Sequence, residues 1–437
     1  MNTTGYLILT VFFLSMSGCD LSSDPDPRDE RPAARCVDGV FSSGALYRVC
    51  IPDYWTAETD DLIIFSPGYT NPESPLSIPD WQIGSEGMSL SDVARSLGYG
   101  FATTSFRANG LLEPEWVSED LIDLVDRFSN EFGDPRHSYL IGFSQGGIIT
   151  TLAIEQFPET AGGYFDGGLA ACGPLGDFRM QFDYKSHFRV LFDYFFGDEL
   201  PDWPVWSQDI DAGDPGYMDE NLMQEWSSTW APLLATLARD EMYADLFDRL
   251  FSMTNAPPDD NAIFPYQNTL TQILWYGIFG TNDAVDKLGG MPFDNSDYIY
   301  AGSEDDTMLN DQIERFRKSA NIREKIDAIT ASGILQVPLV TMHTTADQVV
   351  PNLHALEYGE KVLANQSERH HTHFEIDRYG HCNFTFEEIL AGFSVLTENV
   401  TAKPLEVPES LFDDEIKKSK YIELMRQHGA KHAIVYN

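Results

Sequence analysis

A serine set between glycines offers the first chemistry in this sequence. Residues 138–151 read SYLIGFSQGGIITT, which is a short apolar run, a G-x-S-x-G from Gly142 to Gly146, and then apolar residues at helical spacing. A strand that turns at once into a helix crowds its own backbone, and Gly142 and Gly146 relieve this crowding because they lack side chains. The pattern predicts a nucleophile elbow with Ser144 exposed at its tip, where the hydroxyl can attack a carbonyl carbon.

A nucleophilic serine needs a base and an acid that orients the base, and candidates for both follow later apolar runs. Asp347 comes after residues 337–343 (VPLVTMH), and His381 comes after residues 373–376, and we expect each run to be a core strand. The order serine, aspartate, histidine along the chain is the order expected for an elbow of this kind. Asp377 is an alternative acid, but in the same segment as the histidine it would lie too far along the strand.

The loop after an earlier predicted strand can bind the negative charge that develops on a substrate oxygen. Residues 61–70 read DLIIFSPGYT, an apolar run that ends in Pro-Gly-Tyr. In sites of this type one backbone N–H comes from such a turn and a second from the residue after the nucleophile. We expect Tyr69 and Gln145 to donate these two N–H groups, with Pro67-Gly68 standing where His-Gly is usual. The alternative interpretation is an ordinary turn between a strand and a loop.

Other polar residues in the sequence have a structural interpretation. His370, His371 and His373 could hold a metal, because two of them share one face of a strand, but no cysteine or carboxylate is arranged with them. We therefore expect no metal and no cofactor. Arg107, which follows a strand over residues 99–104, is expected to cap the sheet, and His343 is expected to be structural.

The spacing of the apolar segments predicts the scaffold that positions these residues. Strands and helices alternate in residues 35–175 and again in residues 331–401, which indicates a mainly parallel sheet with helices on both faces. Residues 176–330 interrupt this alternation with aromatic, helix-like stretches, including one over residues 226–251. They predict a large helical cap, inserted after the strand that follows the elbow helix. Its aromatic side chains are expected mainly to form the cap's own core, and alternatively to line a substrate pocket.

Both ends of the chain are expected to lie outside this scaffold. Residues 1–18 carry no charge and contain a short apolar block, which is typical of a signal peptide, and small residues precede Cys19 as in a bacterial lipoprotein. Residues 19–34 are polar and charged and suit a disordered tether. An ordinary secretory signal or a wrongly assigned start remains an alternative. Residues 402–437 are predicted to form a C-terminal helical extension, with a helix over residues 411–428, on the outside of the core.

The cysteine pattern fits an exported protein. The sequence contains five cysteines, and four are left if Cys19 carries a lipid. Cys36 and Cys50 bracket a predicted strand hairpin, so a Cys36–Cys50 disulfide is geometrically easy. A Cys172–Cys382 disulfide then follows by elimination. It would tie the loop that carries the candidate histidine to the sheet.

The charge balance excludes several classes of partner. The chain has 28 Lys and Arg against 69 Asp and Glu, a formal net charge of −41. Such a field repels nucleic acid and anionic membrane surfaces, and it disfavours strongly anionic substrates. We interpret it as adaptation of an exposed surface to salt.

Together the segments IIFSPGY, GFSQGG, HTTADQVVP and YGHCNF resemble the α/β-hydrolase superfamily. AACGPLGDFR, the long insertion and GHCNF are similar to a group of exported bacterial α/β-hydrolases described as prolyl-oligopeptidase-like or uncharacterised. The resemblance implies an α/β-hydrolase fold and a Ser-His-Asp triad, but it says little about the substrate. The β-propeller that a prolyl-oligopeptidase would have is missing from this resemblance.

These observations predict an exported serine hydrolase that is anchored to the cell envelope by a lipid. A carboxylic ester is the expected substrate, and the alternative within enzymes is an exopeptidase or amidase, for which Asp305 and Asp306 could grip a free amino terminus. A hypothesis of another class is a binding lipoprotein on an inactive hydrolase fold. The expected partners are a small-molecule or peptide substrate and, through the anchor, the membrane, and nucleic acid is not among them. The sequence does not set the oligomeric state.

Overall fold

The computed structural model describes residues 34–80, 84–85, 88–200, 223, 225–320, 322–428 and 434–436. The expected signal peptide, Cys19 and the tether up to residue 33 lie outside the described residues. Ala34, which the sequence assigned to the tether, is instead the first residue of strand β1 (Ala34–Val40). Within the described ranges no helix is long and apolar enough to cross a membrane.

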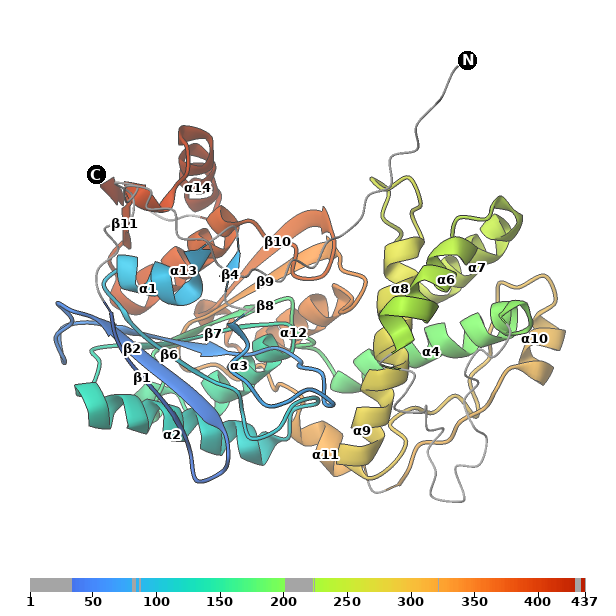
Figure 1. The fold of residues 1–437 in the computed structure, drawn as a ribbon, viewed down its shortest axis with the longest axis horizontal. Helices are drawn as coiled ribbons and strands as arrows, with labels where there is room; N and C mark the ends of the chain where they lie inside the picture. The colour runs from blue at the N-terminus through green and yellow to red at the C-terminus, as the bar shows by residue number, and fades with distance from the viewer. Residues whose placement is uncertain are drawn as a thin grey trace, which may run out of the picture.

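An eight-stranded sheet forms the centre of the larger lobe (Figure 1). In spatial order its strands are β1, β2 (Leu46–Pro52), β6 (Gly100–Thr104), β3 (Leu62–Ser66), β7 (Ser138–Phe143), β8 (Gly167–Ala171), β9 (Leu339–Ala346) and β10 (His371–Tyr379). β2 pairs antiparallel with β1 and β6, and the other neighbours pair parallel. The prediction of a mainly parallel sheet is therefore confirmed.

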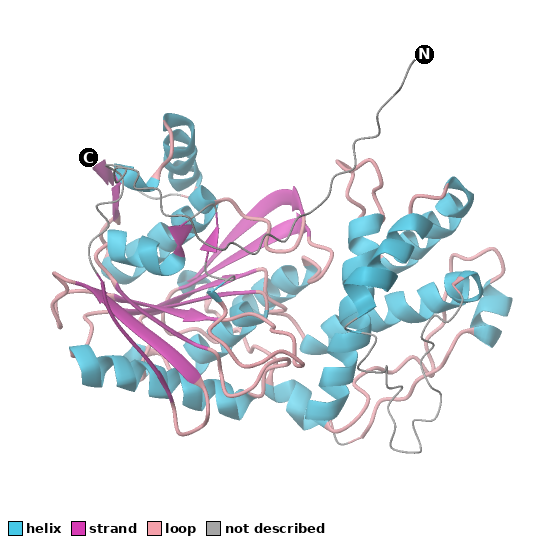
Figure 2. Ribbon diagram, viewed as in Figure 1, coloured by secondary structure: helices cyan, strands magenta, loops and turns pink. Residues whose placement is uncertain are grey.

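Helices cover both faces of this sheet, as Figure 2 shows. One face packs on α2 (Pro114–Phe132), α3 (Gln145–Gln156) and α12 (Leu353–Ala364), and the other on α1 (Leu90–Ser96) and α13 (Phe386–Thr401). Successive strand residues alternate between these two apolar clusters, with Ile64 and Leu140 in the first and Ile63 and Ile141 in the second. Burial on both faces explains why the strands read as continuous apolar runs. A small two-stranded sheet, β4 (Gly84–Ser85) and β5 (Met88–Ser89), precedes α1.

Between β8 and β9 the chain builds a separate helical lobe, the cap, which contains no strand in its described part (Figure 2). Its helices are α4 (Phe178–Phe196), η4 (Gly197–Glu199), η6 (Trp226–Trp230), α6 (Ala231–Leu237), η7 (Glu241–Tyr243), α7 (Ala244–Thr254), α8 (Gln267–Trp275), η8 (Tyr276–Gly280), α9 (Thr281–Leu288), α10 (Asp306–Gln312) and α11 (Arg323–Ala328). Most of its buried aromatic residues pack on one another in a cluster that runs from Phe188 to Phe316. The cap therefore has a hydrophobic core of its own.

The helical stretch expected over residues 226–251 is broken into several pieces. It consists of a π-helical turn (η6), α6, a 3-10 turn (η7) and α7. The break has a local cause, because the Asp240 side chain accepts a hydrogen bond from the backbone N–H of Met242 (3.0 Å) and so starts a new turn. Apolar periodicity continues across such a break, so the sequence pattern alone predicted one helix.

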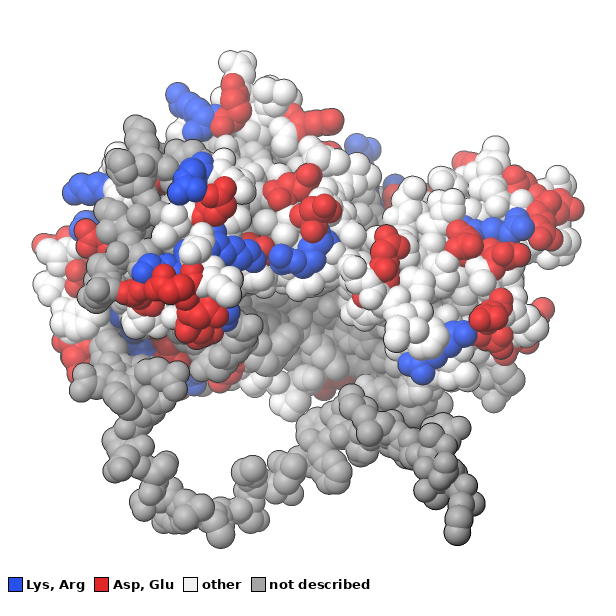
Figure 3. All heavy atoms as spheres, turned by 90° about the horizontal axis from the view of Figure 1, so that it is seen from above, with Lys and Arg blue, Asp and Glu red and all other residues white. Residues whose placement is uncertain are grey.

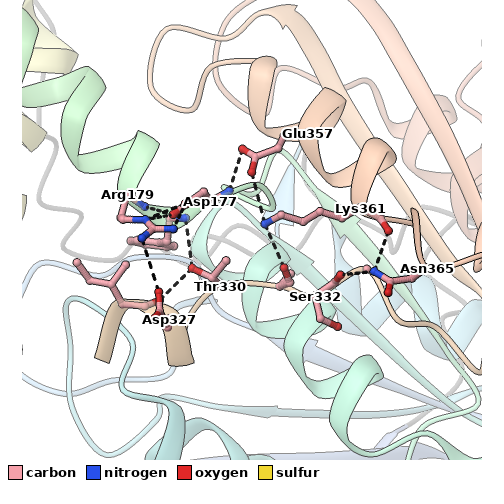
Figure 4. A network of polar contacts seen from close by, with 12 residues as sticks. Asp177, Arg179, Asp327, Thr330, Ser332, Glu357, Lys361 and Asn365 are labelled. Atoms are coloured by element: carbon pink, nitrogen blue, oxygen red, sulfur yellow. Dashed lines mark hydrogen bonds and ion pairs between the residues drawn. The ribbon is translucent and has the colours of Figure 1, made fainter. Parts of the chain in front are cut away.

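The two segments that join the cap to the core meet at one place, on α12 (Figure 4). The backbone N–H of Phe178, at the start of the cap, donates to Thr330 Oγ1 at its end (3.4 Å). The N–H of Asp177 donates to Glu357 of α12 (3.0 Å), and Lys361, one turn further along α12, donates to the backbone of the returning segment (3.2 Å). The chain therefore leaves the core for the cap and returns to it at neighbouring positions beside α12.

The C-terminal extension contains the predicted helix in a shorter form. α14 (Glu415–Gln427) begins where the Asp414 side chain caps it, and it packs on α13 through the buried Tyr421. Two three-residue strands, β11 (Glu406–Pro408) and β12 (Ile434–Tyr436), flank it and pair parallel. Strands this short carry too little alternation to be predicted from a sequence. Single 3-10 turns occur at η3 (Glu159–Ala161), η9 (Glu368–His370) and η10 (Glu409–Leu411).

The acidic residues are spread over both lobes. On the face shown in Figure 3, acidic side chains lie on the core and on the cap, with lysines and arginines between them. This distribution fits a solvated acidic surface better than one concentrated binding patch.

Candidate active site

Ser144 lies at a sharp turn between β7 and α3, as the G-x-S-x-G pattern predicts. Its backbone has φ 55° and ψ −125°, a conformation that residues other than glycine rarely adopt. The flanking glycines are required by close backbone approach. A Cβ on Gly142 would lie 2.0 Å from the carbonyl oxygen of Gly146, and a Cβ on Gly146 would lie 2.2 Å from that of Ser66. The turn thus holds Ser144 at the carboxyl edge of the sheet.

Ser144, His381 and Asp347 form one chain of hydrogen bonds. Ser144 Oγ donates to His381 Nε2 (2.8 Å), and His381 Nδ1 donates to Asp347 Oδ2 (2.7 Å). All three residues follow strands of the parallel sheet, β7, β9 and β10, so their side chains meet at the edge where these strands end. An imidazole placed in this way can accept the serine proton while the carboxylate stabilises the imidazolium that forms.

Asp347 is buried, and its environment holds it in the ionised state. Its Oδ1 accepts the backbone N–H groups of Val349 and Val350 (both 2.9 Å). Burial raises the pKa of the Asp347 carboxyl. The charge and hydrogen bond of His381, together with His343 and the backbone N–H of Val350, outweigh burial and lower this pKa below its ordinary value. His343 lies beside it and donates from Nε2 to the carbonyl oxygen of Val350 (2.8 Å). His343 therefore supports the loop of the acid.

The two residues expected to donate N–H groups to an oxyanion line the same cavity as Ser144. The backbone N–H of Gln145 is the first of α3, where amides have no partner inside the helix. The side chain of Gln145 is used elsewhere, since it donates to Gly110 O (2.9 Å) and accepts from Leu112 N (3.0 Å). The side-chain amide of Gln145 thus holds the loop of Gly110 and Leu112 in place, and its backbone N–H remains the candidate oxyanion donor.

Tyr69 connects the loop after β3 to the cap. Its hydroxyl donates to Asp283 Oδ2 on α9 (2.9 Å), and its ring packs against Trp275 and Tyr276. Burial and then the Asp283 carboxylate raise the pKa of the Tyr69 phenol well above its ordinary value, so the hydroxyl remains a donor. Asp283 also forms an ion pair with Lys287 (3.0 Å). The loop that carries Tyr69 is therefore held by a residue of the cap.

Both predicted disulfides are present. Cys36 and Cys50 are paired across the hairpin of β1 and β2, and Cys172 is bonded to Cys382. The second bond joins the residue after His381 to the residue after β8. The backbone N–H of Ser144 donates to Ala171 O (2.9 Å), which immediately precedes Cys172. This disulfide therefore ties the histidine loop to the strand that also supports the elbow.

A cavity of about 60 Å³ lies above Ser144, between the core and the cap. The cap side is formed by one face of α4 together with Tyr276, and the core side includes Leu111, Val349 and Val350. Gln181 of α4 donates to the carbonyl oxygen of Val349 (2.8 Å), which joins this helix to the loop of Asp347. The surroundings are mainly apolar, with a few polar groups near the serine, as is usual for small-molecule sites.

The alternative functional residues and Arg107 lie outside this cavity. Asp377 is exposed and accepts from Thr345 (3.1 Å) rather than from His381. Asp305 and Asp306 accept hydrogen bonds around the start of α10. Arg107 forms an ion pair with the buried Asp120 (2.7 Å), in line with a structural role. None of these residues lines the cavity around Ser144.

The strand histidines share a single hydroxyl. His371 Nε2 and His373 Nδ1 both lie within hydrogen-bonding distance of Thr341 Oγ1 (2.8 and 2.9 Å). Among the described residues, neither belongs to a cluster of potential metal ligands. The one such cluster in the described ranges consists of Cys172, His381 and Cys382, and two of these three are joined by the disulfide.

Several residues of the site were not predicted from the sequence. Gln181 and Lys185 lie on the face of α4 that lines the cavity, and Asp283 lies on α9. The helical spacing of residues 178, 181, 182 and 185 was the available signal. It indicates a common face of a helix, but it does not show what that face contacts.

Comparisons with known proteins are limited to distant structural likeness. No family profile and no curated protein sequence matches the chain. Similar solved structures include lipase A of Candida antarctica (12% identity, 92% of this chain and 87% of that chain, TM-score 0.45). A second is feruloyl esterase B of Aspergillus oryzae (14% identity, 80% of this chain and 73% of that chain, TM-score 0.44). A third is a putative dipeptidyl aminopeptidase IV of Bacteroides ovatus (12% identity, 87% of this chain and 37% of that chain, TM-score 0.44). The chain spans 37% to 43% of the length of that aminopeptidase and of the matched acylaminoacyl peptidases.

The fold itself defines the class of the protein. Its sheet order, the single antiparallel strand β2, helices on both faces and a strand-elbow-helix after β7 are those of the α/β-hydrolase fold. Within that fold, this chain carries a helical cap between β8 and β9, as the sequence predicts.

Proposed function

We propose that the protein is a serine hydrolase that cleaves carboxylic esters. The observation that carries this proposal is the hydrogen-bonded chain of Ser144, His381 and Asp347 at the elbow, next to a cavity. A serine in a strained turn, with a base within 2.8 Å and an ionised acid behind that base, is the arrangement that activates a hydroxyl. No cofactor enters the proposed reaction.

The proposed reaction proceeds through an acyl-enzyme. Ser144 Oγ attacks the ester carbonyl while its proton passes to His381 Nε2, and Asp347 stabilises the imidazolium. The backbone N–H groups of Gln145 and Tyr69 donate to the oxyanion. His381 then gives the proton to the departing alcohol, and a water molecule activated by the same imidazole releases the acid and restores Ser144.

The alternative within enzymes is an exopeptidase or amidase. Such an enzyme needs carboxylates that hold a free amino terminus close to the nucleophile. Among the described residues, those that line the cavity around Ser144 include no aspartate or glutamate. This observation supports the ester. The alternative of another class, a binding lipoprotein on an inactive hydrolase fold, would give no reason for the three side chains to be hydrogen-bonded in this order.

A covalent probe tests the proposal. We expect a fluorophosphonate to label the purified protein, and Ser144→Ala to abolish the labelling. We also expect p-nitrophenyl esters to be cleaved and aminoacyl-p-nitroanilides to be poor substrates. Faster cleavage of the anilides would favour the peptidase. Absence of labelling in a protein with an intact circular dichroism spectrum would overturn the catalytic role.

We further propose that the protein is exported and lipid-anchored, with residues 1–18 as a cleaved signal peptide and Cys19 as the lipidated residue. The sequence of that segment supports the proposal. The two disulfides support export as well, because disulfides persist in oxidising compartments. The remaining domain boundaries are proposed from the sequence, with a core of residues 35–175 and 331–401, to which β1 adds Ala34, and a cap of residues 176–330.

A further inference from the structure

Among the described residues that line the cavity next to Ser144, one is cationic. Lys185 is on α4, on the same helix face as Phe178, Gln181 and Phe182, and all four residues line the cavity. Its Nζ lies 4.4 Å from the centroid of the Tyr276 ring, which also lines the cavity. The α4 face therefore brings an ammonium group into the space where a substrate of Ser144 must bind.

Lys185 forms no ion pair with any of the described residues, whereas several other lysines do. Lys287 pairs with Asp283 (3.0 Å) and Lys420 pairs with Glu388 (3.1 Å). The carboxylate that acts on Lys185 from a distance is Asp347, which is already hydrogen-bonded to His381. Within the described ranges, Lys185 thus has no carboxylate of its own.

The lack of a counter-ion among the residues that the structure describes has an energetic consequence. Burial lowers the pKa of Lys185 to about 7, although the Asp347 carboxylate acts in the opposite direction. A charged group in a poorly solvated cavity is unfavourable unless an opposite charge accompanies it. A ligand that brings a negative charge would remove this penalty and would keep the ammonium protonated.

We propose that Lys185 selects esters that carry a carboxylate on the acyl or the alcohol side, with this carboxylate bound to the Lys185 ammonium during attack by Ser144. The inference rests on the proposed function, since it names the substrate class of the same site. Lys185 acts as a specificity residue, and Tyr276 positions its ammonium. The reaction itself is unchanged, because the carboxylate takes no part in bond formation or cleavage.

The acidic surface of the protein does not contradict this selection. Its net charge of −41 acts over long distances, and salt at physiological strength screens such fields beyond about 8 Å. The interaction with Lys185 occurs inside the cavity, where screening is weak. We therefore expect the preference for carboxylates to persist at an ionic strength of about 0.15 M, where the surface charge has less effect on substrate approach.

Matched ester pairs test the proposal. On the acyl side the pair is 4-nitrophenyl pentanoate and mono-4-nitrophenyl glutarate, and on the alcohol side it is methyl 4-acetoxybenzoate and 4-acetoxybenzoate. After correction for spontaneous hydrolysis, we expect the anionic member of one pair to have the higher kcat/KM. Lys185→Met is expected to lower the anionic-to-neutral ratio of that pair by about ten- to a hundredfold, the usual worth of a charge-assisted contact. Lys403→Met, a change at an exposed lysine, is the matched control and should leave the ratio unchanged.

The pH dependence gives a second readout. The groups that act on Lys185 are Asp347, the ring of Tyr276 and His354, which lies on α12. Burial and nearby cations lower the pKa of His354 to about 3. Asp347 and His354 therefore keep one charge state above about pH 6, and His381 affects both esters of a pair alike. Well below pH 7 Lys185 is protonated and the preference is full, and the ratio should decline as the pH rises through about 7 and Lys185 loses its proton. The ratio of Lys185→Met should be flat with pH.

The outcomes separate this inference from the proposed function. If the unsubstituted protein cleaves none of the four esters, the proposed ester hydrolysis has failed. If it cleaves them with equal kcat/KM within each pair, or if Lys185→Met keeps the anionic preference with an unchanged thermal unfolding midpoint, the role of Lys185 is overturned. A variant with a lowered unfolding midpoint is judged by the pH profile of the ratio, which a merely destabilised protein would retain.

Discussion

At the residue scale, the proposed function requires the carboxylate of Asp347 to orient His381 as the base. This carboxylate holds the imidazole proton on Nδ1 through a 2.7 Å hydrogen bond, which leaves Nε2 to accept from Ser144. Asp347→Asn keeps the shape but presents an amide, which can stabilise the wrong tautomer. We expect kcat for a p-nitrophenyl ester to fall about 10³- to 10⁴-fold with little change in KM. Steady-state kinetics measure this.

Asp377→Asn is the matched control for that variant. Asp377 is the other aspartate considered as the acid, but it is exposed and bonded to Thr345, so its loss should leave kcat unchanged. Equal losses of kcat in both variants would mean that the acid has been assigned wrongly.

The proximity of Ser144, Asp347 and His381 could be predicted, because each follows an apolar run and parallel strands end at one edge of the sheet. Lys185 and Asp283 could not, because helical spacing does not reveal the partner of a face.

At the scale of elements, the Cys172–Cys382 disulfide connects the loop of His381 to the end of β8. We expect Cys172→Ser with Cys382→Ser to lower kcat by about tenfold or more, because small displacements of a reacting group are costly. The free energy of unfolding should fall by about 2 to 5 kcal/mol. Ester kinetics and urea unfolding measure the two effects.

The paired change Cys36→Ser with Cys50→Ser separates position from stability. That bond lies in the β1–β2 hairpin, at the edge of the sheet opposite β10, so it should lower stability and leave kcat intact. A full kcat after loss of Cys172–Cys382 would show that the loop of His381 keeps its conformation without the disulfide.

The core strands and helices were predictable because their apolar runs are bounded by turn residues. The break at Asp240 and the β11–β12 pair were not, since one is a local cap within a continuous apolar pattern and the other is too short to have a period.

At the scale of the whole molecule, the proposed attachment to the membrane depends on a lipid at Cys19. A net charge of −41 gives no electrostatic attraction to anionic lipids. Because Cys19→Ser removes the thiol that would carry the lipid, this variant should move from the membrane to the soluble fraction of expressing bacteria. Fractionation and labelling with an alkyne-bearing fatty acid measure this, and a membrane-bound, unlabelled variant would contradict the proposed anchor.

The insertion of a cap could be predicted from the interrupted alternation of strands and helices. Its packing over Ser144 depends on contacts between residues far apart in the chain, which the periodicity of the sequence does not indicate.

The hydrogen bond between Phe178 and Thr330 brings the two ends of the inserted lobe together beside α12. Segments whose ends lie close together can be inserted into a host fold, or exchanged, without disturbing its core. Here the proposed nucleophile, base and acid belong to the core, while the walls above them include α4 and η8 of the inserted lobe. A different lobe joined at these two ends would change the walls of the cavity and leave Ser144, His381 and Asp347 in the core. It would also have to replace the contacts of Asp283 with Tyr69 and of Gln181 with Val349.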